Sequence, residues 1–178
     1  MSLVEEAIRN WESYRKGVIA ELENIPEEHW DHCSGAGART LRELARHIAE
    51  AGLGFTTELV RPDCSFLRLF DPQAQAQHKA VLSKANSKAE IVNLLRTTGE
   101  QGARRLREVG DALATQNMKT STGEQSRLTG LWFAAAHEMY HRGQLASYAR
   151  AVGCVPALTQ QIEGMLAGSQ GSRKQSAT

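Results

Sequence analysis

Apolar residues recur at alternating three- and four-residue steps in four long stretches of this chain, and this spacing constrains its fold more than any other feature. Because an α-helix completes a turn every 3.6 residues, each stretch predicts an amphipathic helix that buries one face against its neighbours. The sequence has no convincing alternation of apolar and polar residues that would indicate strands. The apolar face of the first stretch consists of Val4, Ala7, Ile8, Trp11, Tyr14, Val18, Leu22 and Ile25.

Capping boxes mark the starts of three of these helices. In a capping box, a Ser or Thr side chain and a Glu three residues later satisfy free N–H groups of the first helical turn. The sequence places such pairs at Ser2 and Glu5, Thr40 and Glu43, and Ser87 and Glu90. We therefore expect helices to begin directly after each Ser or Thr of these pairs.

Pro and Gly residues predict where the helices end. Pro26 closes the first helix, and the second must stop by Arg61 because a proline follows it. The third helix is expected to end near Gly110. The fourth runs from about Arg127 to a stop at Gly153.

The connections between these helices differ in length and character. Residues 26–39 mix Pro, Gly and Ser without a period, which predicts a loop. Residues 62–86 form a long crossover whose apolar residues favour a short helix or a segment packed across an end of the bundle. Residues 111–130 are polar and predict an irregular segment, and a weaker helix is expected at 157–166.

Four long amphipathic helices predict an all-α protein, a four-helix bundle with a long crossover between the second and third helices. The length of 178 residues is enough for one domain with a substantial core and too short for two comfortable ones. We expect a single helical-bundle domain at 1–167. The remaining residues, 168–178, are polar and small, so we expect a disordered tail there.

The charged residues nearly balance, with 21 Lys and Arg against 20 Asp and Glu and a net charge of +1. A balanced chain gives no overall electrostatic case for binding nucleic acid or an anionic membrane. The local basic cluster of Arg104, Arg105 and Arg107 fits a solvated helix face better than a binding patch. We therefore expect no nucleic-acid or membrane partner.

The three cysteines, Cys33, Cys64 and Cys154, are odd in number and far apart, unlike the disulfide framework of a small secreted domain. We expect reduced thiols. The N-terminal segment carries acidic residues and lacks the apolar core of a signal peptide. No stretch approaches the roughly 20 apolar residues needed to cross a bilayer. These features together favour a cytoplasmic protein.

The residues of greatest chemical interest are His137 and His141, four positions apart on the last long helix. Four residues rotate a helix by about 400°, so both imidazoles project from nearly the same side. Two ligands at this spacing form the minimal metal clip that a helix offers. Gln144 and Tyr148 continue the same line and complete a polar seam facing a core, where buried polar groups need partners.

A metal site that keeps an open position needs a third protein ligand. His47 lies at the edge of the buried stripe of the second helix, so its side chain is able to face inward. Alone it would be interpreted as a hydrogen-bonded histidine of the core, but beside an i, i+4 pair it becomes the best third ligand. His29 and His32 form a competing pair in a loop, where a surface or capping role is the better interpretation. His78 lies among polar residues and is expected to be exposed.

Residues 137–141 also match H-E-x-x-H, a zinc-peptidase pattern in which two His bind zinc and the Glu is the general base. The third ligand of the extended pattern is absent, and Glu163 is the only acidic residue after Glu138. Glu138 lies about 100° from His137 around the helix. A surface or supporting carboxylate is therefore at least as good an interpretation as a catalytic base, and a peptidase is the weakest alternative.

Two motifs in this chain resemble those of the DinB/YfiT-like proteins, metal-binding helical bundles unrelated to the DNA polymerase that shares the first name. The first motif is TLRELARH at 40–47, and the second is HEMYHRGQ at 137–144, followed by a Gly and a Pro at the helix end. The resemblance extends over roughly residues 3 to 156. Relatives often carry a Trp just before the capping Thr, where this chain has Arg39.

The resemblance implies an up-down-down-up order of helices, a homodimer, and a metal triad formed by His47, His137 and His141. It implies nickel or zinc as the bound ion, although imidazole ligands suit several first-row metals. It does not imply a single reaction on a small molecule. Some relatives act with a low-molecular-weight thiol as co-substrate, others have been proposed as hydrolases, and many have no known activity.

Our leading hypothesis is a metal-dependent enzyme of the thiol S-transferase or hydrolase type. Three neutral His ligands leave a divalent ion with its full charge and an open position, so that it lowers the pKa of a bound water or thiol. In this hypothesis Gln144 orients the bound group and Glu138 accepts a proton. The alternative is a non-catalytic dimer, stress-related or structural, in which the metal ties two helices together.

Overall fold

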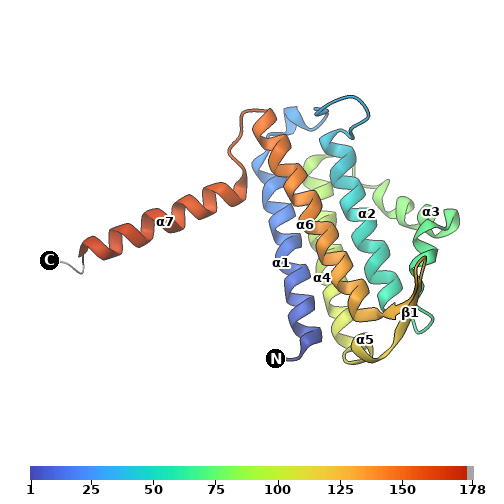
Figure 1. The fold of residues 1–178 in the computed structure, drawn as a ribbon. Coiled ribbons are helices and arrows are strands. Elements are labelled where there is room, and N and C mark those ends of the chain that lie inside the picture. The colour runs from blue at the N-terminus through green and yellow to red at the C-terminus, as the bar shows by residue number, and fades with distance from the viewer. Residues whose placement is uncertain (176–178) are drawn as a thin grey trace.

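Four long helices form the bundle that the apolar stripes predict (Figure 1). The computed structural model describes the backbone of residues 1–175 and the side chains of residues 1–168. α1 packs against α4 and α6, and α2 packs against the same two helices, so the four form a closed ring. The bundle helices are α1 (Leu3–Asn24), α2 (Leu41–Leu59), α4 (Lys88–Val109) and α6 (Arg127–Ala151).

The long crossover between α2 and α4 runs back along the bundle. Figure 1 shows α1 and α6 rising from the end of the bundle where the N-terminus lies, whereas α2 and α4 descend towards that end. The crossover contains a 3₁₀ helix, Phe66–Phe70, and the helix α3, Pro72–Leu82, both packed against α2. The expectation of a short helix in this connection is confirmed.

Two of the three expected capping boxes form completely. At Thr40 and at Ser87 the side chain accepts from the backbone N–H three residues later, and the Glu at that position returns a hydrogen bond to the cap. Ser2 accepts from the N–H of Glu5, but this Glu pairs with Arg9 and Arg107 instead of the cap. The prediction of a full box at the first helix is therefore wrong, because two guanidinium groups compete for the carboxylate.

The segment 111–130, expected to be irregular, contains the short helix α5 (Ala112–Thr115) and a two-stranded antiparallel hairpin. Its strands are β1 (Asn117–Thr120) and β2 (Gly123–Ser126). Met118 is the one strand residue that is buried. No strand was predicted here because a hairpin that is almost wholly exposed shows no alternation of apolar and polar residues.

A layer of polar residues divides the core of the bundle into two apolar clusters. One cluster lies towards the N-terminal end of α1 and includes Ile8 and Trp11, and the other includes Leu22 and Ile48. The buried residues between them include Arg15, Thr98, Glu138 and His141. Burying a polar group costs free energy unless it forms hydrogen bonds, so the residues of this layer are expected to have partners within the bundle.

The last helix, α7 (Ala157–Gln175), projects away from the bundle (Figure 1). Its first N–H groups, at Ala157 and Leu158, donate to the carboxylate of the buried Glu21 at 2.7 and 3.0 Å. The backbone of 168–175 is helical, where the sequence predicted a disordered tail, and the rest of that tail, 176–178, lies outside the described residues.

Within the described residues, none of the helices combines the length and the apolar character that crossing a membrane requires.

Candidate metal centre

His137 and His141 lie one turn apart on α6 with their rings close together. The Nε2 atoms of the two imidazoles are 3.1 Å apart, and the ring centroids are separated by 4.3 Å. Their i, i+4 spacing on a regular helix produces this arrangement, as the sequence predicts. The pair therefore presents two nitrogens to the same small volume.

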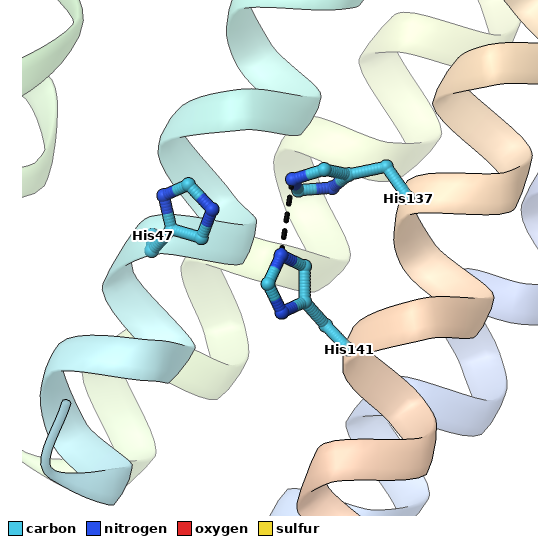
Figure 2. A group of neighbouring side chains, drawn as sticks. All are labelled: His47, His137 and His141. Carbon is cyan, nitrogen blue, oxygen red and sulfur yellow. Dashed lines mark hydrogen bonds between the residues drawn. The ribbon is translucent and has the colours of Figure 1, made fainter. Parts of the chain in front are cut away.

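His47 joins this pair from α2, on the facing side of the bundle (Figure 2). Its ring centroid lies 5.3 Å from that of His137 and 4.9 Å from that of His141. One potential ligating nitrogen of each residue lies within 4.8 Å of the other two, and among the described residues this is the one group of three or more such side chains that could hold a metal ion. The structure thus brings together the three histidines that the sequence singled out.

Burial keeps all three imidazoles neutral. Burial lowers the pKa of His47 to about 4, and the nearby charge of Arg39 adds to the effect. Burial lowers the pKa of His137 to about 3, with a further contribution from the adjacent His141. The pKa of His141 is also lowered by burial, although its hydrogen bond to Gln144 acts in the opposite direction. Neutral imidazoles have free lone pairs, which metal ligation requires.

Gln144 holds the ring of His141 in position. Its Oε1 lies 2.7 Å from Nδ1 of His141, and an amide oxygen only accepts, so the Nδ1–H group is the donor. This tautomer leaves the lone pair on Nε2, the nitrogen that faces His137. The sequence-based hypothesis assigned Gln144 to the bound substrate, whereas its contact in the structure is with a candidate ligand, a common arrangement around metal-bound histidines.

Tyr148 lies two turns beyond His141 and anchors the loop before α2. Its hydroxyl donates a hydrogen bond to the backbone carbonyl of Arg39, and its ring meets that of His32 edge-on at 6.2 Å. The buried Tyr148 therefore fixes the start of the helix that carries His47. Tyr148 therefore contributes to the site indirectly, by fixing the position of the helix that carries His47.

Glu138 is buried and faces α1. Its Oε1 accepts from Nε of Arg15 at 3.0 Å and also from a second nitrogen of that guanidinium, and both side chains are almost fully buried. Burial raises the pKa of the Glu138 carboxyl, and Arg15 opposes this shift. Of the two alternatives to a catalytic base, a surface carboxylate is ruled out, because the direction about 100° from His137 leads to the neighbouring helix α1 and not to solvent.

Arg15 was missed by the sequence-based reasoning, although a signal for it exists. It lies four residues after Trp11 on the buried face of α1, where an arginine needs a partner. Two glycines make room for it: a Cβ atom on Gly52 would collide with the guanidinium, and one on Gly99 would lie 3.2 Å from Cγ of Arg15. A charged residue within an apolar stripe, packed beside glycines and a buried Glu of a neighbouring helix, is the pattern of a buried ion pair.

The histidine cluster borders an open cavity of about 410 Å³. The cavity lies between α2, α6 and the crossover, and its wall includes His47 and His137. His78 of α3 also lines it and is half-buried, so the expectation of an exposed His78 is wrong. The sequence could not place His78 because its position depends on how the crossover packs. The other lining residues are Arg39, Glu50, Ala51, Gly54, Phe55, Leu69, Phe70, Gln75 and Lys79.

The remaining candidates from the sequence lie apart from this cluster. His29 and His32 belong to the loop before α2 and join no group of potential metal ligands among the described residues. The three cysteines are unpaired, as expected. Burial raises the pKa of the Cys64 thiol to about 11, so it stays protonated at neutral pH and is a poor nucleophile.

The three histidines fit a divalent transition-metal ion. Nitrogens bound to one tetrahedral ion at 2.0–2.1 Å lie about 3.3 Å apart, close to the 3.1 Å between the Nε2 atoms of His137 and His141. All three donors are neutral imidazoles, the ligands that first-row divalent ions favour. The donor set therefore matches the chemistry of such an ion.

The fold and the site together define a four-helix bundle with a three-histidine cluster shared by two facing helices. The chain belongs to the DinB family, whose sequence model matches residues 1–166. This match extends over the whole bundle and the first part of α7. Among curated proteins no match was found.

Three solved structures with the same fold, among others that match, come from two species of Bacillus. YfiT from Bacillus subtilis, described as a probable metal-dependent hydrolase with an unusual four-helix bundle topology, superposes with a TM-score of 0.67 at 16% identity, covering 86% of this chain and 91% of its own. A DinB-like protein of the same species, YjoA, gives 0.65 at 17% identity over 83% and 92%. A DinB-like protein from Bacillus cereus gives 0.61 at 17% identity over 83% and 91%. At such identities the likeness shows the fold alone.

Proposed function

We propose that this protein is a divalent-metal-dependent enzyme that acts on a small molecule, with His47, His137 and His141 as the metal ligands. The observation that carries the proposal is the cavity of about 410 Å³ that the cluster borders. A structural metal site is closed by its protein ligands, whereas a catalytic site keeps a position open to substrate. An open cavity beside three protein ligands therefore favours catalysis over a structural role.

The reaction we propose is hydrolysis, with transfer to a low-molecular-weight thiol as the alternative reaction of the same site. Nickel and zinc are the ions we expect. An ion held by the three histidines would supply Lewis acidity, which lowers the pKa of a water or thiol ligand enough to form a nucleophile near neutral pH. The description of YfiT as a probable metal-dependent hydrolase supports the first reaction.

The roles of the protein's own residues follow from their contacts. Gln144 keeps His141 in the tautomer that leaves Nε2 free, and burial keeps the imidazoles neutral. The proposed proton-accepting role of Glu138 has little support, because its carboxylate is buried against Arg15 on the far side of the helix. Glu50 is the carboxylate that lines the cavity, and it is the better candidate for a proton acceptor.

The same geometry weakens the zinc-peptidase alternative. In that mechanism the Glu of H-E-x-x-H must reach the substrate as general base. Here the Glu138 carboxylate accepts hydrogen bonds from Arg15 within the core, away from the cavity. The residue spacing matches the H-E-x-x-H motif, but the Glu138 side chain points towards α1 and not into the cavity beside the histidines.

The remaining alternative is a non-catalytic metal-binding protein, stress-related or structural. For that protein, removing the metal lowers stability and affects no turnover. Assembly as a homodimer and a location in the cytoplasm are expectations that accompany either function. The open cavity is what separates the two functions in favour of an enzyme.

Metal content tests the ligand assignment directly. Untagged protein is expected to carry one equivalent of divalent metal per chain, and His47→Ala and His141→Ala are expected to lose it. His78→Ala is the matched control, since this residue lines the same cavity without joining the cluster. If His47→Ala retains the wild-type metal content, the triad is wrong.

The reaction is tested by screening metal-loaded protein against ester and amide substrates and against electrophiles supplied with thiol cofactors. Turnover by the wild type that disappears in His141→Ala supports the enzyme. Turnover only in the presence of a thiol identifies the transferase. Metal binding without turnover across the panel favours the non-catalytic protein.

A further inference from the structure

We propose that Arg39 forms an anion-binding subsite beside the histidine cluster, and that the cavity accepts a small organic carboxylate with an apolar body. The inference rests on the proposed function, because it identifies the class of molecule that the metal-dependent enzyme would bind. It concerns a residue that is not part of the proposed ligand set.

The position of Arg39 is the first argument. Its side chain lines the cavity shared with His47 and His137, and it also lines a neighbouring hollow bounded by Gln144 and Tyr148. Arg39 thus belongs to the wall of both hollows, one of which also contains His47 and His137. Its positive charge is close enough to contribute to the lowered pKa of all three histidines.

The backbone of Arg39 is fixed by a hydrogen bond at its own carbonyl and by the helix cap at the next residue. Its carbonyl accepts the hydrogen bond from the hydroxyl of Tyr148, and the next residue, Thr40, caps α2 with a complete capping box. The side chain therefore extends from a fixed point, although it is itself exposed. A fixed origin lowers the entropy cost of binding a ligand with a flexible arginine.

The second argument is that Arg39 has no carboxylate partner. Among the side chains that the structure describes, no Asp or Glu forms an ion pair with it. Two other arginines at the start of α2 are occupied: Arg42 pairs with Asp31, and Arg46 donates to the carbonyl of Ala85 and to Asn86. Arg39 is free to bind an external anion through the two-pronged geometry that guanidinium offers a carboxylate.

The charges and the walls of the cavity define the rest of the ligand. Its formal charges are Arg39 and Lys79 against the single Glu50, so the cavity is positive even with neutral histidines. A bound divalent ion would add to this excess. Apolar side chains form much of the remaining wall, namely Phe55, Leu69 and Phe70. An anionic group near Arg39 with an apolar body against these side chains satisfies both features.

The test compares an acid with its neutral analogue on the metal-loaded protein. Calorimetric titration with 3-phenylpropionate and with 3-phenylpropanamide measures how much the negative charge of the ligand contributes to its affinity. We expect the wild type to bind the acid more tightly than the amide, and Arg39→Ala to lose about 10- to 100-fold of the acid's affinity, as for a charged hydrogen bond. Arg39→Lys should retain part of the preference.

Arg104→Ala is the matched control, because it removes the same charge from an exposed arginine of α4 outside the cavity. The proposal is overturned if the wild type fails to bind the acid, if it binds the amide equally well, or if the two Ala variants weaken acid binding equally. Metal content is measured on every sample. Loss of metal in Arg39→Ala would make it a structural residue and would also overturn the subsite.

The same titration on metal-stripped protein separates this proposal from the proposed function. Arg39 is not a ligand, so its effect on the ratio of acid to amide affinity should persist without the ion. If the wild type binds no metal but retains an Arg39-dependent preference for the acid, the metal-dependent enzyme fails and the anion subsite stands. If metal and turnover are present but the preference is missing, the subsite fails alone.

Discussion

His137 and Glu138 are adjacent in the sequence, yet their side chains face different helices. His137 meets His47 of α2, and Glu138 meets Arg15 of α1. One turn of α6 therefore contributes both to the candidate metal site and to a buried ion pair. Both partners of this ion pair are buried, so removing one of them would leave an uncompensated charge in the core.

We expect Arg15→Met to lower the free energy of unfolding by about 3–5 kcal/mol, because the Glu138 carboxylate would remain buried without its partner. Urea unfolding followed by tryptophan fluorescence measures the change. Adding Glu138→Gln removes the stranded charge, so the double variant should recover part of the loss. A double variant that is less stable than Arg15→Met would contradict this account.

A second residue-level prediction concerns Gln144. Replacing it with Leu removes the acceptor for Nδ1–H of His141, so we expect metal affinity to fall about 10- to 100-fold, measured by competition with a chelator. Gln144→Glu is the control, since its carboxylate still accepts from the same N–H. Wild-type affinity in Gln144→Leu would mean that the His141 ring is held by its packing alone.

At this scale the sequence predicts which side chains share a face of a helix better than it predicts which neighbouring helix they contact. The pair His137 and His141 follows from the period of the helix alone, and the cluster with His47 is present in the structure. The partner of Glu138 could not be derived, because helical geometry gives an angle around α6 but not the helix that lies there. Arg15 can be recognised as the partner of Glu138 only once α1 is known to pack against α6.

At the scale of elements, the helix boundaries were predictable because they depend on local chemistry. Thr40 and Ser87 begin α2 and α4 with complete capping boxes, and Gly110, with φ of +58°, ends α4 where a left-handed residue is needed. The hairpin β1–β2 and the placement of α3 were not predictable. Their stability comes from contacts with α2 and α6 that the local sequence does not encode.

The difference between complete and partial caps gives a prediction for the helix starts. Thr40→Ala should lower the free energy of unfolding by about 1 kcal/mol, the usual cost of losing an N-cap. Ser2→Ala should cost less, because its box is incomplete and its helix begins at an exposed end of the bundle. Parallel urea titrations compare the two. Equal losses would show that the returned hydrogen bond of the box contributes nothing here.

At the scale of the whole molecule, the histidine cluster connects two helices of the ring, α2 and α6. A ligand that binds only the folded state stabilises it in proportion to the logarithm of its concentration above the dissociation constant. With free metal at about 100 times that constant, the gain is about 2.7 kcal/mol. The cluster is therefore expected to act as a cross-link as well as a reaction centre.

We expect chelation to lower the melting temperature of the metal-loaded protein by about 5–10 °C, measured by circular dichroism. His47→Ala should melt at the same temperature with and without the chelator, because it cannot complete the site. His78→Ala should behave as the wild type. A chelator effect that persists in His47→Ala would place the stabilising ion elsewhere.

The division of the cluster between α2 and α6 also determines when the proposed metal site can form. His47 is synthesised early, but its two partners are added only after the crossover, α4 and the hairpin have been made. A chain still growing on the ribosome holds a single imidazole of the set and competes poorly for a divalent ion. With the proposed ligand set, metal capture would therefore wait until α6 has been made, and a chain that lacks α6 would not compete for divalent ions through this site.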